Sequence, residues 1–176
     1  MKVVMPRMTG PLSFLSIVGL SILAFIVVDL FAATEADAIV CQRVQVRFLQ
    51  YRTTGCPSPI GVCTTAEVDS GPLKGTKTFS MLNAAPSAGL GPVEPAATVS
   101  YAGPALITTD KGELNVSFVG VYDTAKRVIS EFGRVVGGSG RFARATGILY
   151  SYGTVNEAGT VFDSTLTGDV CVSDAA

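Results

Sequence analysis

Apolar and polar residues alternate along short segments of this chain, and that period of two is the feature that most constrains its fold. In residues 43–48, arginine or glutamine alternates with Val44, Val46 and Phe48, and residues 114–118 repeat the pattern. Successive side chains of a strand point to opposite faces of a sheet, so this alternation is typical of half-buried strands. No stretch after residue 39 has the apolar periodicity of a helix. The sequence therefore predicts an all-β protein.

Turn-like sequences rich in glycine, proline, asparagine and aspartate separate the alternating segments. The predicted strands cover residues 42–51, 61–69, 73–82, 97–108, 112–122, 127–136, 144–153 and 160–172. Eight short strands with tight connections predict an eight-stranded antiparallel up-and-down barrel, in which closure removes the exposed strand edges. A two-sheet sandwich with the same number of strands is the alternative.

The longest separator is a segment rich in proline, glycine and alanine over residues 84–95. It is long for a hairpin connection, so it is a candidate lid or partner-contact loop. A surface excursion without a role is the alternative, since loops accept added residues at small cost.

The N-terminus has the three-part pattern of an export signal. Two basic residues precede an uncharged apolar run over residues 14–28, and small residues stand at the −3 and −1 positions of a site that ends at Ala38. This pattern predicts a signal peptide over residues 1–38 and a domain over residues 39–176 that is secreted, periplasmic or in the cell envelope. The alternative is a retained single-span anchor, because the uncharged run has about the minimum length that crosses a bilayer.

All four cysteines lie in the predicted domain, as expected for an exported protein that uses disulfides. Cys56 and Cys63 flank a proline-containing turn, which favours a short local loop. Cys41 and Cys171 lie in the first and last predicted strands, both on the outward parity, where a bridge would join the two ends of the domain. We therefore expect the bridges Cys41–Cys171 and Cys56–Cys63. A zinc site of four thiolates is the alternative, although no two cysteines have the usual spacing for one.

The 176 residues include no histidine, and their formal net charge is −1. The lack of imidazole excludes Ser-His-Asp and Cys-His catalytic groups, histidine-ligated zinc and axial histidine ligation of haem. A near-neutral chain also lacks the surplus of basic residues that nucleic acid binding requires. A dinucleotide-type glycine pattern at residues 138–143 leads into a predicted strand rather than a helix. We therefore expect no metal, no cofactor and no nucleic acid, and an uncharged or apolar small molecule as the simplest ligand.

Inward-facing apolar and aromatic side chains are the candidates to line the barrel. The interior of an eight-stranded barrel is just wide enough for side chains or for one small ligand, so a filled core and a ligand cavity both stay open. The candidate ligand-lining residues are Val46, Phe48, Phe79, Phe118, Phe132, Phe162 and Leu166.

Glu131 is the one carboxylate in a markedly apolar predicted strand, and it is the single candidate for a catalytic residue. If it pointed inward, it would act as a general acid or form a hydrogen bond with a ligand. Its apolar neighbours do not keep a single phase, so strand parity does not fix its direction. We expect Glu131 to face solvent, because glutamate is rarely buried without a partner.

The segment Val135–Gly147, with the sequence VVGGSGRFARATG, resembles the allene oxide cyclase barrel-like group of calycin type, which includes the plant dirigent proteins. That group carries a Val-Gly-Gly-Thr/Ser-Gly-x-Phe-x-x-Ala-x-Gly signature before its last strands. Residues 56–64, 71–75 and 120–123 look like those of uncharacterised secreted bacterial members. The resemblance implies an eight-stranded antiparallel barrel, often a homotrimer, that holds an apolar small molecule.

In the cyclase and dirigent proteins the barrel constrains a reactive substrate without a catalytic triad or a metal. The resemblance therefore implies a cofactor-independent cyclase or isomerase, or a dirigent-like coupling protein, and none of the family's catalytic residues maps onto this chain. We interpret Gly137, Gly138 and Gly140 as a structural turn and Phe142 as the plug of a barrel end. The expectation is a secreted, disulfide-stabilised barrel that binds a small hydrophobic ligand and steers its cyclisation or coupling. The alternative is a non-enzymatic structural or interaction module of the cell envelope with a filled barrel.

Overall fold

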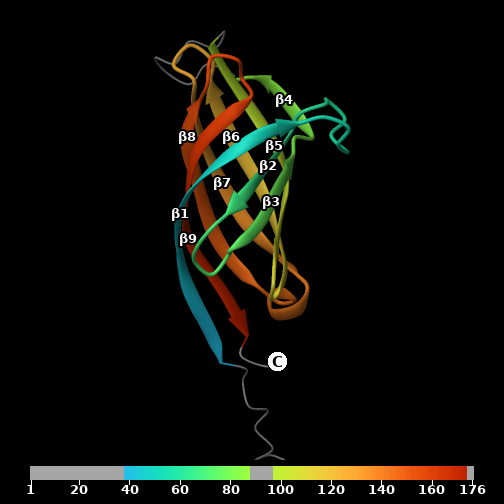
Figure 1. Ribbon diagram of the computed structural model, residues 1–176, viewed down its shortest axis with the longest axis vertical. Coiled ribbons are helices and arrows are strands. Elements are labelled where there is room, and N and C mark those ends of the chain that lie inside the picture. Colours follow the sequence, from blue (N-terminus) through green and yellow to red (C-terminus); the bar gives the residue numbers. More distant parts are fainter. Residues whose placement is uncertain (1–37, 88–96, 174–176) are drawn as a thin grey trace, which may run out of the picture. The chain divides into compact units, whose positions relative to one another are not determined.

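Nine β-strands make up nearly all of the regular structure in the computed structural model, which describes residues 38–87 and 97–173 (Figure 1). The strands are β1 (Ile39–Thr53), β2 (Cys63–Val68), β3 (Gly75–Ser80), β4 (Asn83–Pro86), β5 (Thr98–Thr109), β6 (Gly112–Asp123), β7 (Val128–Gly138), β8 (Thr146–Val155) and β9 (Val161–Ser173). A short 3-10 helix, η2 (Gly140–Phe142), lies between β7 and β8. Apart from Ala38, the predicted signal peptide and its anchor alternative fall outside the described residues. Within those residues, no helix has the length and apolar character needed to cross a membrane.

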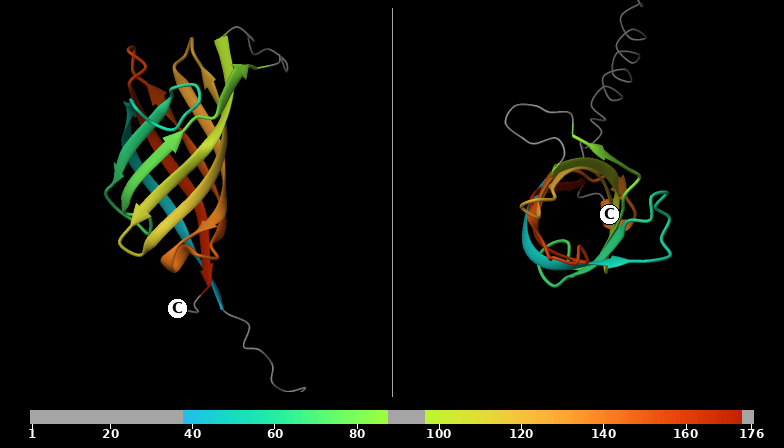
Figure 2. Two further views of the ribbon diagram at one scale, coloured as in Figure 1. Left: turned by 90° about the vertical axis from the view of Figure 1, so that its right-hand side faces the viewer. Right: turned by 90° about the horizontal axis from the view of Figure 1, so that it is seen from above.

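Eight of the strands form a closed antiparallel ring, which confirms the predicted barrel and excludes the sandwich alternative. The order around the ring is β3-β2-β1-β9-β8-β7-β6-β5, and β5 pairs again with β3 to close it. Viewed from above in Figure 2, the strands surround a common axis. Each ring strand corresponds to one predicted strand, with ends that differ by a few residues.

The ninth strand, β4, corrects the loop predicted over residues 84–95. It pairs with residues 99–102 of β5, whereas β3 pairs with residues 105–109, so β3 and β4 follow one another along the same edge of β5. An unpaired edge exposes backbone hydrogen-bonding groups, and β4 covers the part of β5 that extends beyond β3. Residues 88–96 of the predicted loop, with its proposed lid role, lie outside the described residues.

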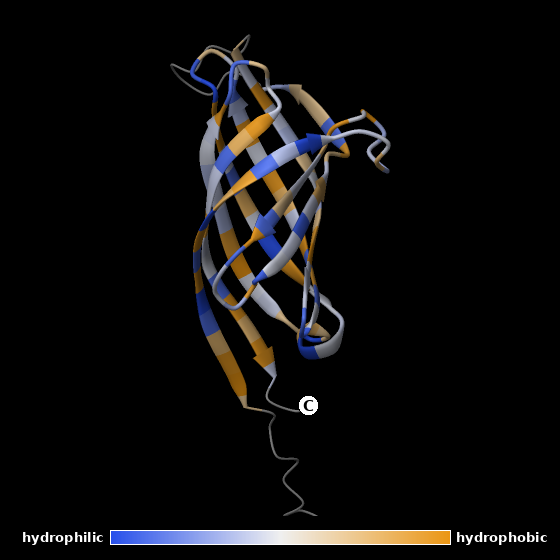
Figure 3. Ribbon diagram, viewed as in Figure 1, coloured by the Kyte–Doolittle hydropathy of each residue, from blue (hydrophilic) through white to orange (hydrophobic). Residues whose placement is uncertain are grey.

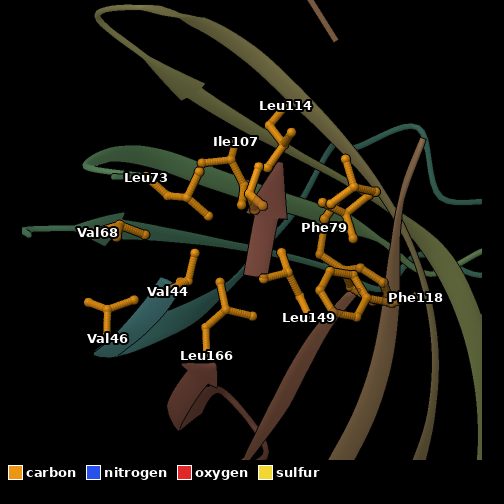
Figure 4. Close-up of a cluster of buried hydrophobic side chains, with 14 of the residues drawn as sticks. Val44, Val46, Val68, Leu73, Phe79, Ile107, Leu114, Phe118, Leu149 and Leu166 are labelled. Atoms are coloured by element: carbon orange, nitrogen blue, oxygen red, sulfur yellow. The ribbon is translucent and has the colours of Figure 1, made fainter. Parts of the chain in front are cut away.

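One end of the barrel, here called the closed end, is filled by apolar side chains. It carries the β2–β3, β5–β6 and β7–β8 connections and lies at the bottom of Figure 1. Apolar and polar residues alternate along the strands (Figure 3), and the apolar ones meet inside the barrel (Figure 4). Val44, Ile107, Leu114, Leu149 and Leu166 are each at most 1% exposed. Full burial of one such side chain stabilises the fold by about 1.5–3 kcal/mol.

The short helix η2 covers the closed end with one aromatic side chain. Phe142 is buried in the apolar core, and its amide donates a hydrogen bond to the carbonyl oxygen of Ser139. Gly137 and Gly140 adopt φ angles of 104° and 55°, a region that favours glycine. A Cβ atom at Gly138 would lie 1.8 Å from the carbonyl oxygen of Glu113. The glycines of this segment therefore permit the tight turn that carries Phe142 into the core.

Two large inward rings lie over glycines of the neighbouring strand. Phe118 of β6 is in register with Gly133 of β7, and Tyr101 of β5 is in register with Gly120 of β6. A Cβ atom at Gly133 would lie 2.4 Å from the Phe118 ring, and one at Gly120 would lie 2.6 Å from the Tyr101 ring. These glycines therefore provide the space in which the two rings lie flat against the barrel wall.

Both predicted disulfides are present. Cys41 and Cys171 are directly opposite each other on β1 and β9, and their bridge joins residues 130 positions apart in sequence. Cys56 and Cys63 close a local loop of separation 7 before β2. No free cysteine occurs, since the four cysteines of the chain are all in these two bridges. Two disulfides are compatible with an extracellular or other oxidising environment.

Candidate functional site

The opposite end of the barrel, here called the open end, contains a cavity of about 270 Å³. This end carries the β1–β2, β6–β7 and β8–β9 connections and lies at the top of Figure 1. The apolar part of the wall consists of Val62, Phe79, Met81, Val99, Tyr122, Ile129, Val155 and Phe162. The polar part consists of Gln50, Thr64, Tyr101 and Glu131, and Arg52 and Gly159 complete the lining. An apolar cavity with a few polar groups is the usual form of a small-molecule site.

A row of four residues in register runs across four strands on the inner wall. Tyr101 of β5 is opposite Gly120 of β6, Gly120 is opposite Glu131 of β7, and Glu131 is opposite Ser151 of β8. Because Gly120 has no side chain, the Tyr101 ring lies over it and the phenol reaches the carboxylate two strands away. The Tyr101 hydroxyl donates a hydrogen bond to Glu131 Oε1 at 2.9 Å.

Glu131 points into the barrel, contrary to the expectation that it faces solvent. Its exposed fraction is 7%, and β7 alternates strictly, with Ile129, Glu131, Gly133 and Val135 buried. The expectation was wrong because β7 carries apolar residues on both faces, so hydropathy alone did not identify which face points into the barrel. Glu131 Oε1 accepts from Tyr101, whereas Glu131 Oε2 is buried and has no hydrogen-bond partner. A buried carboxylate oxygen without a donor is costly, so it is a place where a ligand group would be favoured.

Lys77 is a second buried charged residue, and the sequence analysis missed it. It is 2% exposed, and its ammonium lies 5.6–5.8 Å from the ring centroids of Phe48, Phe79 and Phe118. Its Nζ also donates a hydrogen bond to Gln50 Oε1 at 2.5 Å. The sequence did offer one signal: Lys77 is two residues from Phe79, so both side chains point to the same face of the strand. Aromatic faces attract cations and partly replace the water that Lys77 loses on burial.

Burial and charge change the protonation equilibria of this interior. Burial lowers the pKa of Lys77, and the negative charge of Glu131 opposes that shift. Burial also raises the pKa of Tyr101, and the charge and hydrogen bond of Glu131 add to the shift. Tyr101 therefore keeps its proton and acts as a donor to the carboxylate. Lys77 and Glu131 are the two ionisable side chains of the acid and base type that are buried within the described residues, so the interior holds one basic and one acidic group.

Gln50 links the buried lysine to the cavity wall. Its Oε1 accepts from Lys77 Nζ and, at 3.3 Å, from the Thr64 hydroxyl. Its Nε2 donates to the Ser164 hydroxyl oxygen at 3.0 Å. These three partners fix which end of the Gln50 amide faces Lys77, so the polar side of the cavity has a defined arrangement of donors and acceptors.

The predicted lining residues separate into three groups. Phe79 and Phe162 line the cavity. Val46, Phe48, Phe118 and Leu166 are buried in the barrel but do not line the cavity. Phe132 is 42% exposed and lies on the outer face, where its ring is edge-to-face with that of Tyr150 at a centroid distance of 5.7 Å. The assignment of Phe132 to the lining is corrected, because Glu131 next to it occupies the inward position of β7.

Within residues 38–87 and 97–173, no group of three histidine, cysteine, aspartate or glutamate side chains is placed to hold a metal ion. Comparison with known proteins gives no further assignment: no family model, no curated protein and no solved structure matches this chain. The candidate site therefore rests on its own geometry, which is an apolar cavity with a buried carboxylate at its wall.

Proposed function

We propose that this protein binds a small, largely apolar molecule in the open end of its barrel. The observation that carries the proposal is the cavity of about 270 Å³ whose wall includes Glu131, a buried carboxylate in which one oxygen has no hydrogen-bond partner. Ligand pockets typically measure about 300–1,000 Å³, so a small ligand with few polar atoms suits this one. The eight apolar side chains of the wall would contact its body, and Glu131 would contact one polar group.

The distribution of packing supports this proposal. The core is continuous at the closed end, where apolar side chains from β1, β5, β6, β8 and β9 meet, and the cavity begins at the level of Phe79 and Tyr101. Protein interiors are close-packed, and cavities much larger than a water molecule are few. A cavity of this size above a filled core is therefore typical of a binding site rather than of a packing defect.

The finer proposal is that the cavity steers the cyclisation or coupling of its ligand after secretion of the protein. Enclosure by rigid walls favours one conformation of a flexible molecule and lowers the entropic cost of a ring closure. Tyr101, as a hydrogen-bond donor, and Glu131, as the acceptor, both lie in the wall and are held in place by their mutual hydrogen bond. Catalysis here would accordingly depend on shape and on hydrogen bonding to these two groups.

Thermal unfolding in the presence of apolar compounds tests ligand binding. Wild-type protein should be stabilised by compounds that fit the cavity, because a ligand that binds the folded state raises the melting temperature. Met81→Trp places an indole at the cavity, and Leu82→Trp places it on the next residue, which is 49% exposed and does not line the cavity. Stabilisation should be lost in the first variant and kept in the second. Equal stabilisation of both variants, or none of wild type, would contradict the proposal.

A second candidate function, an interaction module, is favoured by the outer surface. Val119, Val121, Phe132 and Tyr150 are each at least 42% exposed on β6, β7 and β8, beside an outer groove of about 720 Å³. Exposed apolar patches of this kind mark protein contacts. Under this reading, further copies of the chain cover the patch, as in the expected trimer. Sedimentation of wild type and of Phe132→Asp tests it: a monomeric wild type would contradict it.

A further inference from the structure

We propose that Glu131 and Ser151 together recognise a hydroxyl group on the bound molecule, so that the ligand is an apolar alcohol. This inference rests on the proposed function, because it specifies what the cavity binds. Ser151 is 1% exposed and is not among the residues that line the cavity.

Glu131 and Ser151 share an unusual property. Among the described residues, Glu131 Oε2 and Ser151 Oγ are the two buried side-chain atoms without a hydrogen-bond partner. The two residues are directly opposite each other on β7 and β8, and both side chains point inward with exposed fractions of 7% and 1%. Residues directly opposite on neighbouring strands have Cβ atoms about 4.5–5.5 Å apart. The two unpartnered oxygens therefore belong to one polar spot, with Glu131 on the cavity wall and Ser151 beside it.

The arrangement around Glu131 leaves Oε2 as the atom for a ligand. Tyr101 occupies Oε1 from the β5 side, and its high pKa keeps it a donor to that oxygen. Ser151 flanks the carboxylate from the β8 side. A group that enters from the cavity and donates to Oε2 would lie next to the Ser151 hydroxyl. An acceptor on that same group would receive the serine proton, and both orphan oxygens would then be satisfied.

The chemistry of the two oxygens selects among possible ligand groups. A ketone or ether has acceptors only, so its oxygen would face the carboxylate oxygen without a proton between them. An ammonium would donate to both atoms, but the basic side chain of Lys77 already lies in the same buried interior as Glu131. A second cation would leave the apolar interior with an excess positive charge, which is costly. A neutral hydroxyl donates one hydrogen bond, accepts another and adds no charge, so it fits best.

Four compounds with one bicyclic skeleton provide the test: the hydrocarbon bornane, the alcohol borneol, the ketone camphor and the amine bornylamine. Dissociation constants would be measured by calorimetry at neutral pH, where the amine is a cation. Borneol should bind at least about tenfold more tightly than bornane, camphor or bornylamine, since it alone gains hydrogen bonds to a charged acceptor without added charge.

Two variants locate the selectivity. Ser151→Ala should reduce the preference for borneol over bornane severalfold. Glu131→Gln replaces a group that only accepts hydrogen bonds by an amide that also donates them. The amide N–H can donate to the ketone oxygen of camphor, so the affinity for camphor should rise relative to that for borneol. Ser130→Ala, next to Glu131 on the exposed face of β7, is the matched control and should leave all four affinities unchanged. The Glu131→Gln result keeps the test informative if Ser151→Ala proves poorly folded.

The outcomes separate the two proposals. Binding of bornane and camphor as tightly as borneol would overturn hydroxyl recognition while supporting an apolar cavity. Tighter binding of bornylamine than of borneol would also overturn hydroxyl recognition, because the preferred ligand would then be a cation. Failure of all four compounds to bind would contradict the proposed function itself.

Discussion

Lys77 and Gln50 form a buried hydrogen bond of 2.5 Å that links the filled half of the barrel to its cavity. Lys77 lies among three aromatic rings, and Gln50 lines the cavity wall. A buried ammonium is tolerated because the rings, the amide oxygen and the charge of Glu131 together offset part of its lost hydration.

The first prediction concerns the pH dependence of stability caused by Lys77. Burial lowers the pKa of this residue in the folded state, so the unfolded chain binds the proton more tightly. The lysine's contribution is fully favourable above its unfolded pKa of about 10.4 and declines as the pH falls towards the folded value. The free energy of unfolding of wild type minus that of Lys77→Met should therefore rise with pH in the two units below about 10.4. Its slope is at most about 1.4 kcal/mol per pH unit.

Denaturant unfolding of both proteins at matched pH values measures this difference. Subtraction removes the contributions of the other titrating groups, which the two proteins share. A difference that stays constant over that range would contradict the lowering of the Lys77 pKa by burial.

The second prediction concerns the hydrogen bond between Tyr101 and Glu131. Tyr101→Phe removes the donor and leaves the carboxylate of Glu131 with both oxygens unsatisfied, so stability at pH 7 should fall by about 1.5–3 kcal/mol. Because the pKa of Tyr101 is raised by burial and by Glu131, the wild-type advantage is complete below the unfolded pKa of about 10 and declines above it. Tyr152→Phe, at a residue 53% exposed, should change stability by less than about 0.5 kcal/mol. Equal effects of the two substitutions in chemical denaturation would count against the buried hydrogen bond.

The third prediction concerns Gly120, which makes room for the Tyr101 ring. Its substitution by alanine places a Cβ atom 2.6 Å from that ring, and overpacking of this kind typically costs about 1–3 kcal/mol. Part of the cost is displacement of the phenol from Glu131, so Gly120→Ala should cost less in a Tyr101→Phe background than in wild type. A double-mutant cycle measures this coupling.

Gly133→Ala is the matched control for that cycle. It creates a comparable clash with the Phe118 ring, at 2.4 Å, but does not involve the hydrogen bond. Its cost should add to that of Tyr101→Phe within about 0.5 kcal/mol. If the costs of Gly120→Ala and Tyr101→Phe are also additive, the phenol of Tyr101 keeps its position without the glycine, and the prediction is contradicted.

The fourth prediction compares the two disulfides. In the chain-entropy model, a bridge across 130 residues stabilises the fold by about 5 kcal/mol, and one across 7 residues by about 2.4 kcal/mol. The double substitution of Cys41 and Cys171 by serine should therefore lower the free energy of unfolding by more than that of Cys56 and Cys63. The reverse order in denaturant unfolding would mean that the local loop holds the open end together more strongly than chain entropy suggests.

The fold was largely predictable because its determinants are local in sequence. The period of two at Val44, Val46 and Phe48 is a direct consequence of strand geometry, and the turn residues between strands limit the strand ends. The Cys41–Cys171 bridge followed from the positions and parity of the two residues. The strand β4 was not predicted, because its pairing with β5 depends on how far β5 extends beyond β3. That extension is a property of the tertiary structure.

The site was less predictable, because it depends on which face of each strand is inward. Phe132 and Glu131 are adjacent, and hydropathy placed the aromatic ring inside, whereas the barrel places the carboxylate there. Ser151 carries no sequence signal at all, since its importance lies in being opposite Glu131 on another strand. Lys77 has a signal in its parity with Phe79, but the general preference of lysine for solvent opposes that interpretation.

The most direct test of the proposed cavity is where a bound ligand lies. Intermolecular nuclear Overhauser effects between unlabelled borneol and methyl groups of ¹³C-labelled protein report that position. The proposed function predicts contacts with Val99, Ile129 and Val155, whose side chains line the barrel cavity. Contacts with Val119 and Val121 instead would place the ligand in the outer groove and would contradict a binding site inside the barrel.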